Sequence, residues 1–269
     1  MDITGLHNGR ITVPAAFEQV FSHFYYAVNS GPQTISKTLL PGFQTILVFS
    51  FGTPVTLLSG NAEIAMDKCM VLGPIKRAFD YLLPPGSDLL VANFKNDAFY
   101  RFFGEQVMSN IPIATDALSG DNCFTGLWQV LREIKMPEAR VDAILKYAAP
   151  YLGQQHITAS LLLQQDTYLN LVKTIARDTN QTERNVQLQQ KKQFGYSLQE
   201  IIRYRRFLKA VNLVQDKLAT GALKIDWFDI IVACDYYDQS QLVHDFKHFL
   251  NLTPGAFLRF QENICRPLP

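Results

Sequence analysis

The chain has 269 residues, of which 48% are hydrophobic and 18% are charged, and its formal net charge at pH 7 is +1. This length suits two domains, and the composition is that of an ordinary globular protein, which excludes disordered and fibrous classes. No apolar run of about 18 residues occurs, so we expect no membrane span, and the first ten residues lack the basic start and apolar core of a secretory signal. The sequence has four widely spaced cysteines, Cys69, Cys123, Cys234 and Cys265, and we expect them to be reduced, buried thiols of a cytoplasmic protein.

The N-terminal part has the pattern of short strands. Turn signals such as Pro41-Gly42 and Pro84-Pro85-Gly86 recur at short intervals between residues 33 and 96, and residues 45–51 are β-branched and aromatic. This spacing predicts an antiparallel sandwich or a small barrel. Residues 17–28 are rich in aromatic side chains and are ambiguous between strand and helix.

Two helices are predicted next. Residues 123–134 and 139–149 carry apolar side chains every three or four positions, which is the period of an amphipathic helix. We expect these helices to connect to the next domain or to support dimerisation. Pro150 and Gly153 mark a break, and only helices and short turns are predicted from residue 156 onward.

Positive charge is concentrated in one block of the chain. Residues 171–225 carry 11 Lys and Arg against 4 Asp and Glu, a net charge of +7, whereas residues 1–170 carry 11 against 14 and residues 226–269 carry 3 against 6. A basic block is most often a solvated helix face. Its coincidence with the pattern described next favours contact with DNA phosphates, which supply much of the affinity of DNA-binding proteins.

Residues 171–195 have the pattern of a helix-turn-helix. A first helix ends at Asn180, a residue type that tolerates the left-handed backbone of a tight turn. Thr182 is predicted to cap a second helix. This second helix is predicted to expose Arg184, Gln187 and Gln189, and Arg and Gln side chains suit the guanine and adenine edges of the major groove.

A second such unit follows. Residues 197–218 are predicted to form a long basic helix that carries Arg203, Arg205, Arg206 and Lys209. In residues 230–260, Asp235-Tyr236-Tyr237 form the turn, Asp238 caps the next helix, and Pro254 opens a last short helix.

These two units, over about residues 162–260, resemble the DNA-binding domain of AraC/XylS-type regulators. The stretch YYDQSQLVHDFKHFLNLTPGAFLR looks like that family's signature, and RFLKAVNLV looks like its linker-helix pattern. The resemblance implies that the second helix of each unit enters the major groove. It implies base contacts by Arg184, Gln187, Gln239, Ser240 and His244, phosphate contacts by Lys191, Lys192 and Lys247, and a further DNA-binding position at Thr182.

Several positions depart from the family's pattern. Asp235 and Asn251 stand where glycine is preferred, Ile231 where a small Ala is usual, Leu188 where Arg is common, and Gln190 where a core aromatic residue is usual.

The N-terminal region, about residues 14–151, resembles cupin-like sensor domains through LPGFQTILVFSFG, VLGPIKRAF and LLVANFKNDAFYRFFG. A cupin metal site needs an HxH cluster, and His23 is the only histidine between Asn8 and Gly153, so we expect no metal there. His244 and His248 lie four residues apart but lack a third ligand nearby. We find no nucleophile elbow, phosphate-cradling loop or HExxH helix, so we expect neither an enzyme nor a cofactor.

Together these features predict an α+β protein. Residues 1–154 form a cupin-like antiparallel β domain with helices, and residues 155–269 form an all-α domain of two helix-turn-helix units joined by a linker helix. The predicted function is sequence-specific, ligand-responsive regulation of transcription, with double-stranded DNA and an unidentified small-molecule effector as partners. The resemblance also allows RNA polymerase and a second copy of the chain as partners. The alternative, favoured by the acidic second unit, is a small-molecule or protein-binding module whose DNA-binding domain has degenerated.

Overall fold

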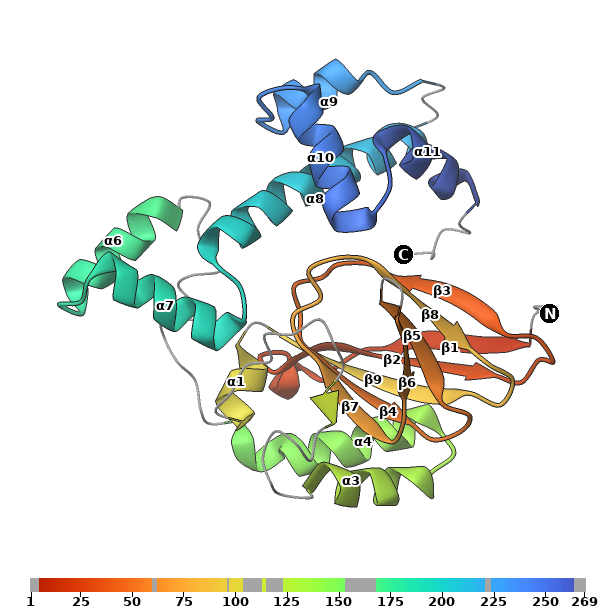
Figure 1. The fold of residues 1–269 in the computed structure, drawn as a ribbon. Helices are drawn as coiled ribbons and strands as arrows, with labels where there is room; N and C mark the ends of the chain where they lie inside the picture. The colour runs from red at the N-terminus through yellow and green to blue at the C-terminus, as the bar shows by residue number, and fades with distance from the viewer. Residues whose placement is uncertain are drawn as a thin grey trace. The chain divides into compact units, whose positions relative to one another are not determined.

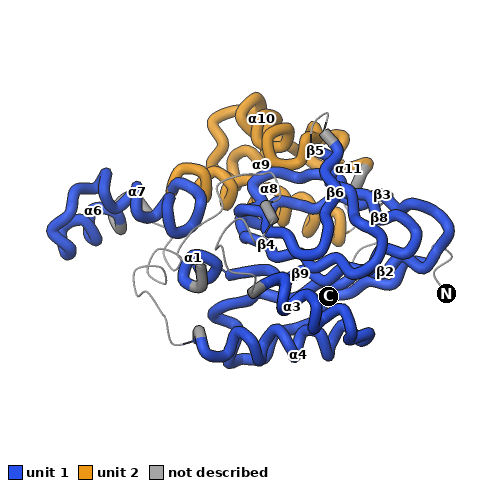
Figure 2. Tube along the Cα trace, turned by 60° about the horizontal axis from the view of Figure 1, so that its bottom comes forward, with its two compact units in different colours: residues 1–197 blue, residues 198–269 orange. Residues whose placement is uncertain are grey.

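A computed structural model describes residues 5–59, 62–95, 97–103, 113–114, 123–152, 168–220 and 224–263. The chain divides into two compact units, residues 1–197 and 198–269 (Figure 2). The first helix-turn-helix therefore groups with the N-terminal unit. The predicted domain boundary near residue 154 lies outside the described residues and stays a prediction.

The first unit contains two antiparallel sheets (Figure 1). The larger sheet has the strand order β1 (Leu6–Ile11), β2 (Phe21–Asn29), β9 (Asp88–Phe94), β4 (Ile46–Ser50), β7 (Cys69–Leu72) and β10 (Ile113–Ala114). The smaller sheet has the order β3 (Ile35–Leu39), β8 (Phe79–Leu83), β5 (Val55–Ser59) and β6 (Ala62–Met66). The described helices of this unit are η1 (Ala15–Phe17), α1 (Ala98–Phe103), α3 (Cys123–Arg132), α4 (Pro137–Ala148), η2 (Ala149–Tyr151), α6 (Tyr168–Asp178) and α7 (Glu183–Phe194).

Both faces of the larger sheet are buried at its inner strand β4. On β4, Ile46 and Val48 join a core that they share with Leu57 of the smaller sheet. Leu47 and Phe49 point the other way, into a core that they share with α1, α3 and α4. Because successive residues of a strand point to opposite faces, all five residues of β4 are buried.

The second unit is helical and has an aromatic core. Its described helices are α8 (Leu198–Ala219), α9 (Trp227–Ala233), α10 (Gln239–Leu250) and α11 (Pro254–Asn263). The ring of Phe207 on α8 lies 4.7 Å from that of Phe249 and 5.2 Å from that of Phe246, and Phe257 of α11 lies 5.4 Å from Phe246. All four side chains are fully buried, so α8, α10 and α11 share one core.

The predicted α+β class is confirmed by these elements. The ambiguous residues 17–28 form the end of η1 and most of β2, and the predicted helices at 123–134 and 139–149 are α3 and α4. Cys69 and Cys234 are buried and outside any disulfide, as predicted, whereas Cys265 and the Cys123 side chain lie outside the described part. None of the helices that the structure describes has the length and hydropathy to cross a membrane.

Candidate DNA-binding surface and ligand pocket

A tight turn joins α6 to α7. Asn180 has a φ of 52°, and the next residue, Gln181, donates its N–H to the Ala176 carbonyl at 2.8 Å. The Oγ1 of Thr182 accepts the Asn185 N–H at 3.2 Å. Thr182 is thus the N-cap of α7, as predicted, and this capping role fixes where the helix begins.

The helix α7 has one buried and one exposed side. Val186, Gln190 and Phe194 are buried at intervals of four residues. Positions 184, 187, 188 and 191 follow the spacing of a single helix face. The exposed side chains of α7 include all five predicted on it, Arg184, Gln187, Gln189, Lys191 and Lys192, together with Leu188.

The turn before α10 has the same construction in the second unit. Asp235 has a φ of 57°, and the Oδ1 of Asp238 accepts the Gln241 N–H at 2.8 Å, which caps α10 as predicted. Asn251, in place of a glycine, ends α10 with a φ of 59°. The predicted DNA-binding side chains on α10 are all exposed, namely Gln239, Ser240, His244 and Lys247.

A buried carboxylate ties α10 to α8. Asp245 is 1% exposed, and its two oxygens accept from Arg203 Nε at 2.6 Å and from Arg206 Nη2 at 3.3 Å. Arg203 also donates from Nη2 to His244 Nδ1 at 2.8 Å. A guanidinium only donates, so Nδ1 of His244 accepts this bond, and Nε2 is the ring nitrogen that Arg203 does not engage. The sequence predicted Arg203 and Arg206 only as members of a basic helix, and it did not predict their pairing with Asp245.

The same cluster reaches the turn before α10. The Arg206 guanidinium lies 4.5 Å from the centre of the Tyr236 ring. Burial is the main cause of a raised pKa of Tyr236, and the nearby Asp245 carboxylate is the second cause, so the phenol is neutral at physiological pH. Helix α10 and its turn are therefore held to α8 by charge as well as by aromatic packing.

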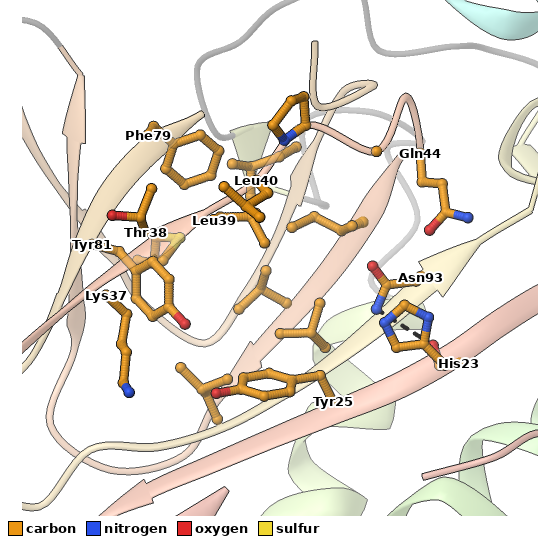
Figure 3. A pocket seen from close by; sticks show the side chains of 18 of the residues that line it. His23, Tyr25, Lys37, Thr38, Leu39, Leu40, Gln44, Phe79, Tyr81 and Asn93 are labelled. Carbon is orange, nitrogen blue, oxygen red and sulfur yellow. Dashed lines mark hydrogen bonds between the residues drawn. The ribbon is translucent and has the colours of Figure 1, made fainter. Parts of the chain in front are cut away.

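A cavity of about 430 Å³ opens between the sheets of the first unit (Figure 3). Its wall is mostly apolar and comes from both sheets, with Ile46, Val48, Met66, Leu72, Leu89 and Val91 among its members. Its charged and polar lining includes Arg10, His23, Lys37, Gln44 and Asn93, and no carboxylate lines it among the described residues. The sequence suggested a sensor domain but did not identify these residues, because they come from strands far apart in the chain.

The ionisable groups of the pocket favour a bound anion. Burial, and next the charge of Arg10, lower the pKa of His23, so its ring is neutral at physiological pH. Burial raises the pKa of both Tyr25 and Tyr81, which hydrogen-bond to each other. Arg10 and Lys37 are therefore the charged side chains of the described pocket lining.

One loop lines the pocket and also contacts the segment after α7. Leu40, Pro41, Gly42 and Gln44 line the cavity. Between them, Phe43 has a φ of 52°, is 5% exposed, and its ring lies 5.2 Å from that of Tyr196 in an edge-to-face arrangement. Within the first unit, one aromatic contact thus connects the loop that lines the pocket to the segment that follows α7.

Among the described residues, no group of three or more His, Cys, Asp and Glu side chains could hold a metal ion. His244 and His248 stack with their ring centres 6.3 Å apart, and His244 is already bonded to Arg203.

Comparison with known proteins gives distant structural likenesses. No protein-family model matches the chain. No curated protein matches it either. A structure of ToxT from Vibrio cholerae bound to an unsaturated fatty acid aligns over 92% of this chain and 96% of its own, with 12% identity and a TM-score of 0.41. The AraC-like transcriptional activator CuxR aligns over 97% of this chain and 77% of its own, with 8% identity and a TM-score of 0.29. An oxalate oxidase in complex with glycolate aligns over 55% of this chain and 74% of its own, with 12% identity and a TM-score of 0.27. These identities and TM-scores are too low to assign a function to the chain.

Proposed function

We propose that the chain is a sequence-specific DNA-binding regulator of transcription, with no enzymatic activity, whose N-terminal pocket binds a small effector. The observation that carries the proposal is the pair of capped helices, α7 and α10. Each helix follows a tight turn in which one residue has a left-handed backbone conformation. Each buries one side and exposes long hydrogen-bonding and cationic side chains on the other. This combination suits the major groove, where Arg and Gln recognise base edges and Lys neutralises phosphate.

The pocket supports an effector with an apolar body and an anionic end. Two cations line a mostly apolar cavity that has no described carboxylate to neutralise them. A bound anion would therefore gain charge-assisted hydrogen bonds while its apolar part leaves water. The contact between Phe43 and Tyr196 offers a connection from the pocket to the end of α7. RNA polymerase and a second copy of the chain remain proposed partners.

The DNA-binding proposal is tested by separating base contacts from phosphate contacts. The probe is the tightest duplex selected from a randomised library with the full chain. Arg184→Ala and Gln187→Ala are each expected to weaken binding to this duplex by about 1–3 kcal/mol, with little effect on random DNA, because each removes hydrogen bonds to a base edge.

The matched control, Lys191→Ala with Lys192→Ala, is expected to weaken binding to the selected duplex and to random DNA alike. It is also expected to reduce the slope of log affinity against log salt by about one unit for each phosphate that is no longer neutralised. Equal weakening on both duplexes for Arg184→Ala would contradict base recognition by this residue.

The effector proposal is tested with two dyes that differ by one charged group. 8-Anilinonaphthalene-1-sulfonate is anionic, and N-phenyl-1-naphthylamine has the same rings without the sulfonate. Lys37→Met is expected to weaken binding of the sulfonate about tenfold and to leave the neutral dye unchanged, because a charge-assisted hydrogen bond is worth about 1.5 kcal/mol or more. Lys146→Met, at an exposed position on α4, is the control. An equal effect on both dyes would show that Lys37 acts on the shape of the pocket and not on the anion.

A further inference from the structure

Leu188 stands out among the side chains of α7. It is 57% exposed, yet it lies on the helix face that carries Arg184, Gln187 and Lys191. A large apolar side chain among polar ones leaves apolar surface in water, and a partner that covers this surface gains binding free energy.

Leu188 cannot serve the core of the unit. Val186, two positions earlier, is 4% exposed, and residues two apart on a helix point about 200° apart. The helix therefore buries Val186 and directs Leu188 to the outer face. Covering Leu188 requires a surface that also accepts the cations and amide beside it.

We propose that Leu188 reads the C5-methyl group of a thymine, either in the base pair contacted by Gln187 or in a pair next to it. The thymine methyl is the apolar group that a base pair presents in the major groove, and apolar side chains recognise it by contact. The side-chain amide of a residue such as Gln187 hydrogen-bonds to adenine. The partner base of adenine is thymine, so the same base pair also presents a methyl group in the major groove. The inference rests on the proposed function, because it assigns a base to the face already proposed to bind DNA.

Thymine and deoxyuridine differ by this methyl group alone, which allows a direct test. Using the full chain and the duplex selected from a randomised library, each thymidine is replaced in turn by deoxyuridine. At one or two positions, the wild-type chain is expected to lose about fourfold in affinity, the equivalent of one buried methyl or methylene group. Leu188→Ala is expected to bind the thymine duplex more weakly by a similar factor, and to bind thymine and deoxyuridine equally at those positions.

Two further variants keep the result interpretable. Leu188→Met retains an apolar side chain and is expected to retain the preference for thymine. Val130→Ala on α3 is the matched control, because Val130 is also 57% exposed, and it is expected to keep the full deoxyuridine penalty. Melting temperatures of all variants are measured to confirm folding.

The outcomes distinguish this inference from the proposed function. A selected duplex whose binding is insensitive to every deoxyuridine overturns the reading of thymine by Leu188 while leaving DNA binding intact. So does an unchanged penalty in Leu188→Ala, which would leave Leu188 as a contact for a protein. Failure of the library to yield any preferred sequence refutes the proposed function, and this inference with it.

Discussion

Replacing Arg140 by Ala is expected to lower the free energy of unfolding of the first unit by about 3–5 kcal/mol. Arg140 is 2% exposed, and its two terminal nitrogens donate to the Asp88 carboxylate at 2.8 and 2.9 Å. Its Nε donates to the carbonyls of Leu131 and Ile134, and its guanidinium lies 3.8 Å from the centre of the Phe51 ring. The substitution leaves a carboxylate and two carbonyls without this partner, and it removes the polar link from α4 to β9.

The two tryptophans make this destabilisation measurable in the full chain. Trp128 lies on α3 and donates to the Ser50 carbonyl at 2.7 Å, whereas Trp227 lies in the second unit. In a Trp227→Phe background, denaturant unfolding followed by fluorescence reports the first unit through Trp128. Lys146→Ala, at an exposed position on α4, is the control and is expected to change stability by less than about 0.5 kcal/mol. A similar small change for Arg140→Ala would show that α4 is held by its apolar side chains alone.

Local chemistry explains what could be predicted from the sequence. Thr182 and Asp238 cap helices through bonds to residues three positions later, and Asn180 sets a turn through its own backbone preference. Such features depend on a few neighbouring residues, so the two helix-turn-helix units and their exposed side chains could be placed closely. The short strands were predictable for the same reason, because turn residues separate them.

The pairings that hold these elements together depend on residues far apart in the chain. Arg140 and Asp88 are 52 positions apart, and Arg203 and Asp245 are 42 apart. No local pattern marks one charged residue as buried and another as solvated, so these pairs were not predicted. The pocket was missed for a related reason, because its described lining comes from eight strands whose order in space differs from their order in sequence.

Leu188 could be predicted only in part from the sequence. The sequence marked it as an apolar residue of α7 and as a departure from the Arg that is common in the family. Helix geometry separates it from Val186, but its 57% exposure became visible only with the packing of α6 against α7. Under the proposed function, Leu in place of Arg at this exposed position of α7 changes the base that is read from guanine to thymine.

The other large effect is expected at Asp245. Asp245→Asn removes the charge that Arg203 and Arg206 share, and an amide offers only one accepting oxygen to the two guanidinium groups. Both arginines are partly exposed, at 30% and 25%, so water compensates part of this effect. We expect the second unit to lose about 2–3 kcal/mol of stability, somewhat less than for a fully buried pair. Trp227 fluorescence in a Trp128→Phe background reports this change.

Asp245→Asn is also expected to weaken binding to the selected duplex, since Arg203 would no longer hold the His244 ring at 2.8 Å. The control is Asp235→Asn, which removes a carboxylate that is 89% exposed and pairs with Lys209 at 3.8 Å. Such exposed pairs contribute little, so its stability is expected to stay within about 0.5 kcal/mol of wild type. If the two variants unfolded alike, the buried cluster would contribute no more than a surface ion pair. If Asp245→Asn lost stability but bound the duplex as tightly as wild type, His244 would not depend on Arg203 for its position. The aromatic core and the Asp238 cap would then be enough to position α10 for binding.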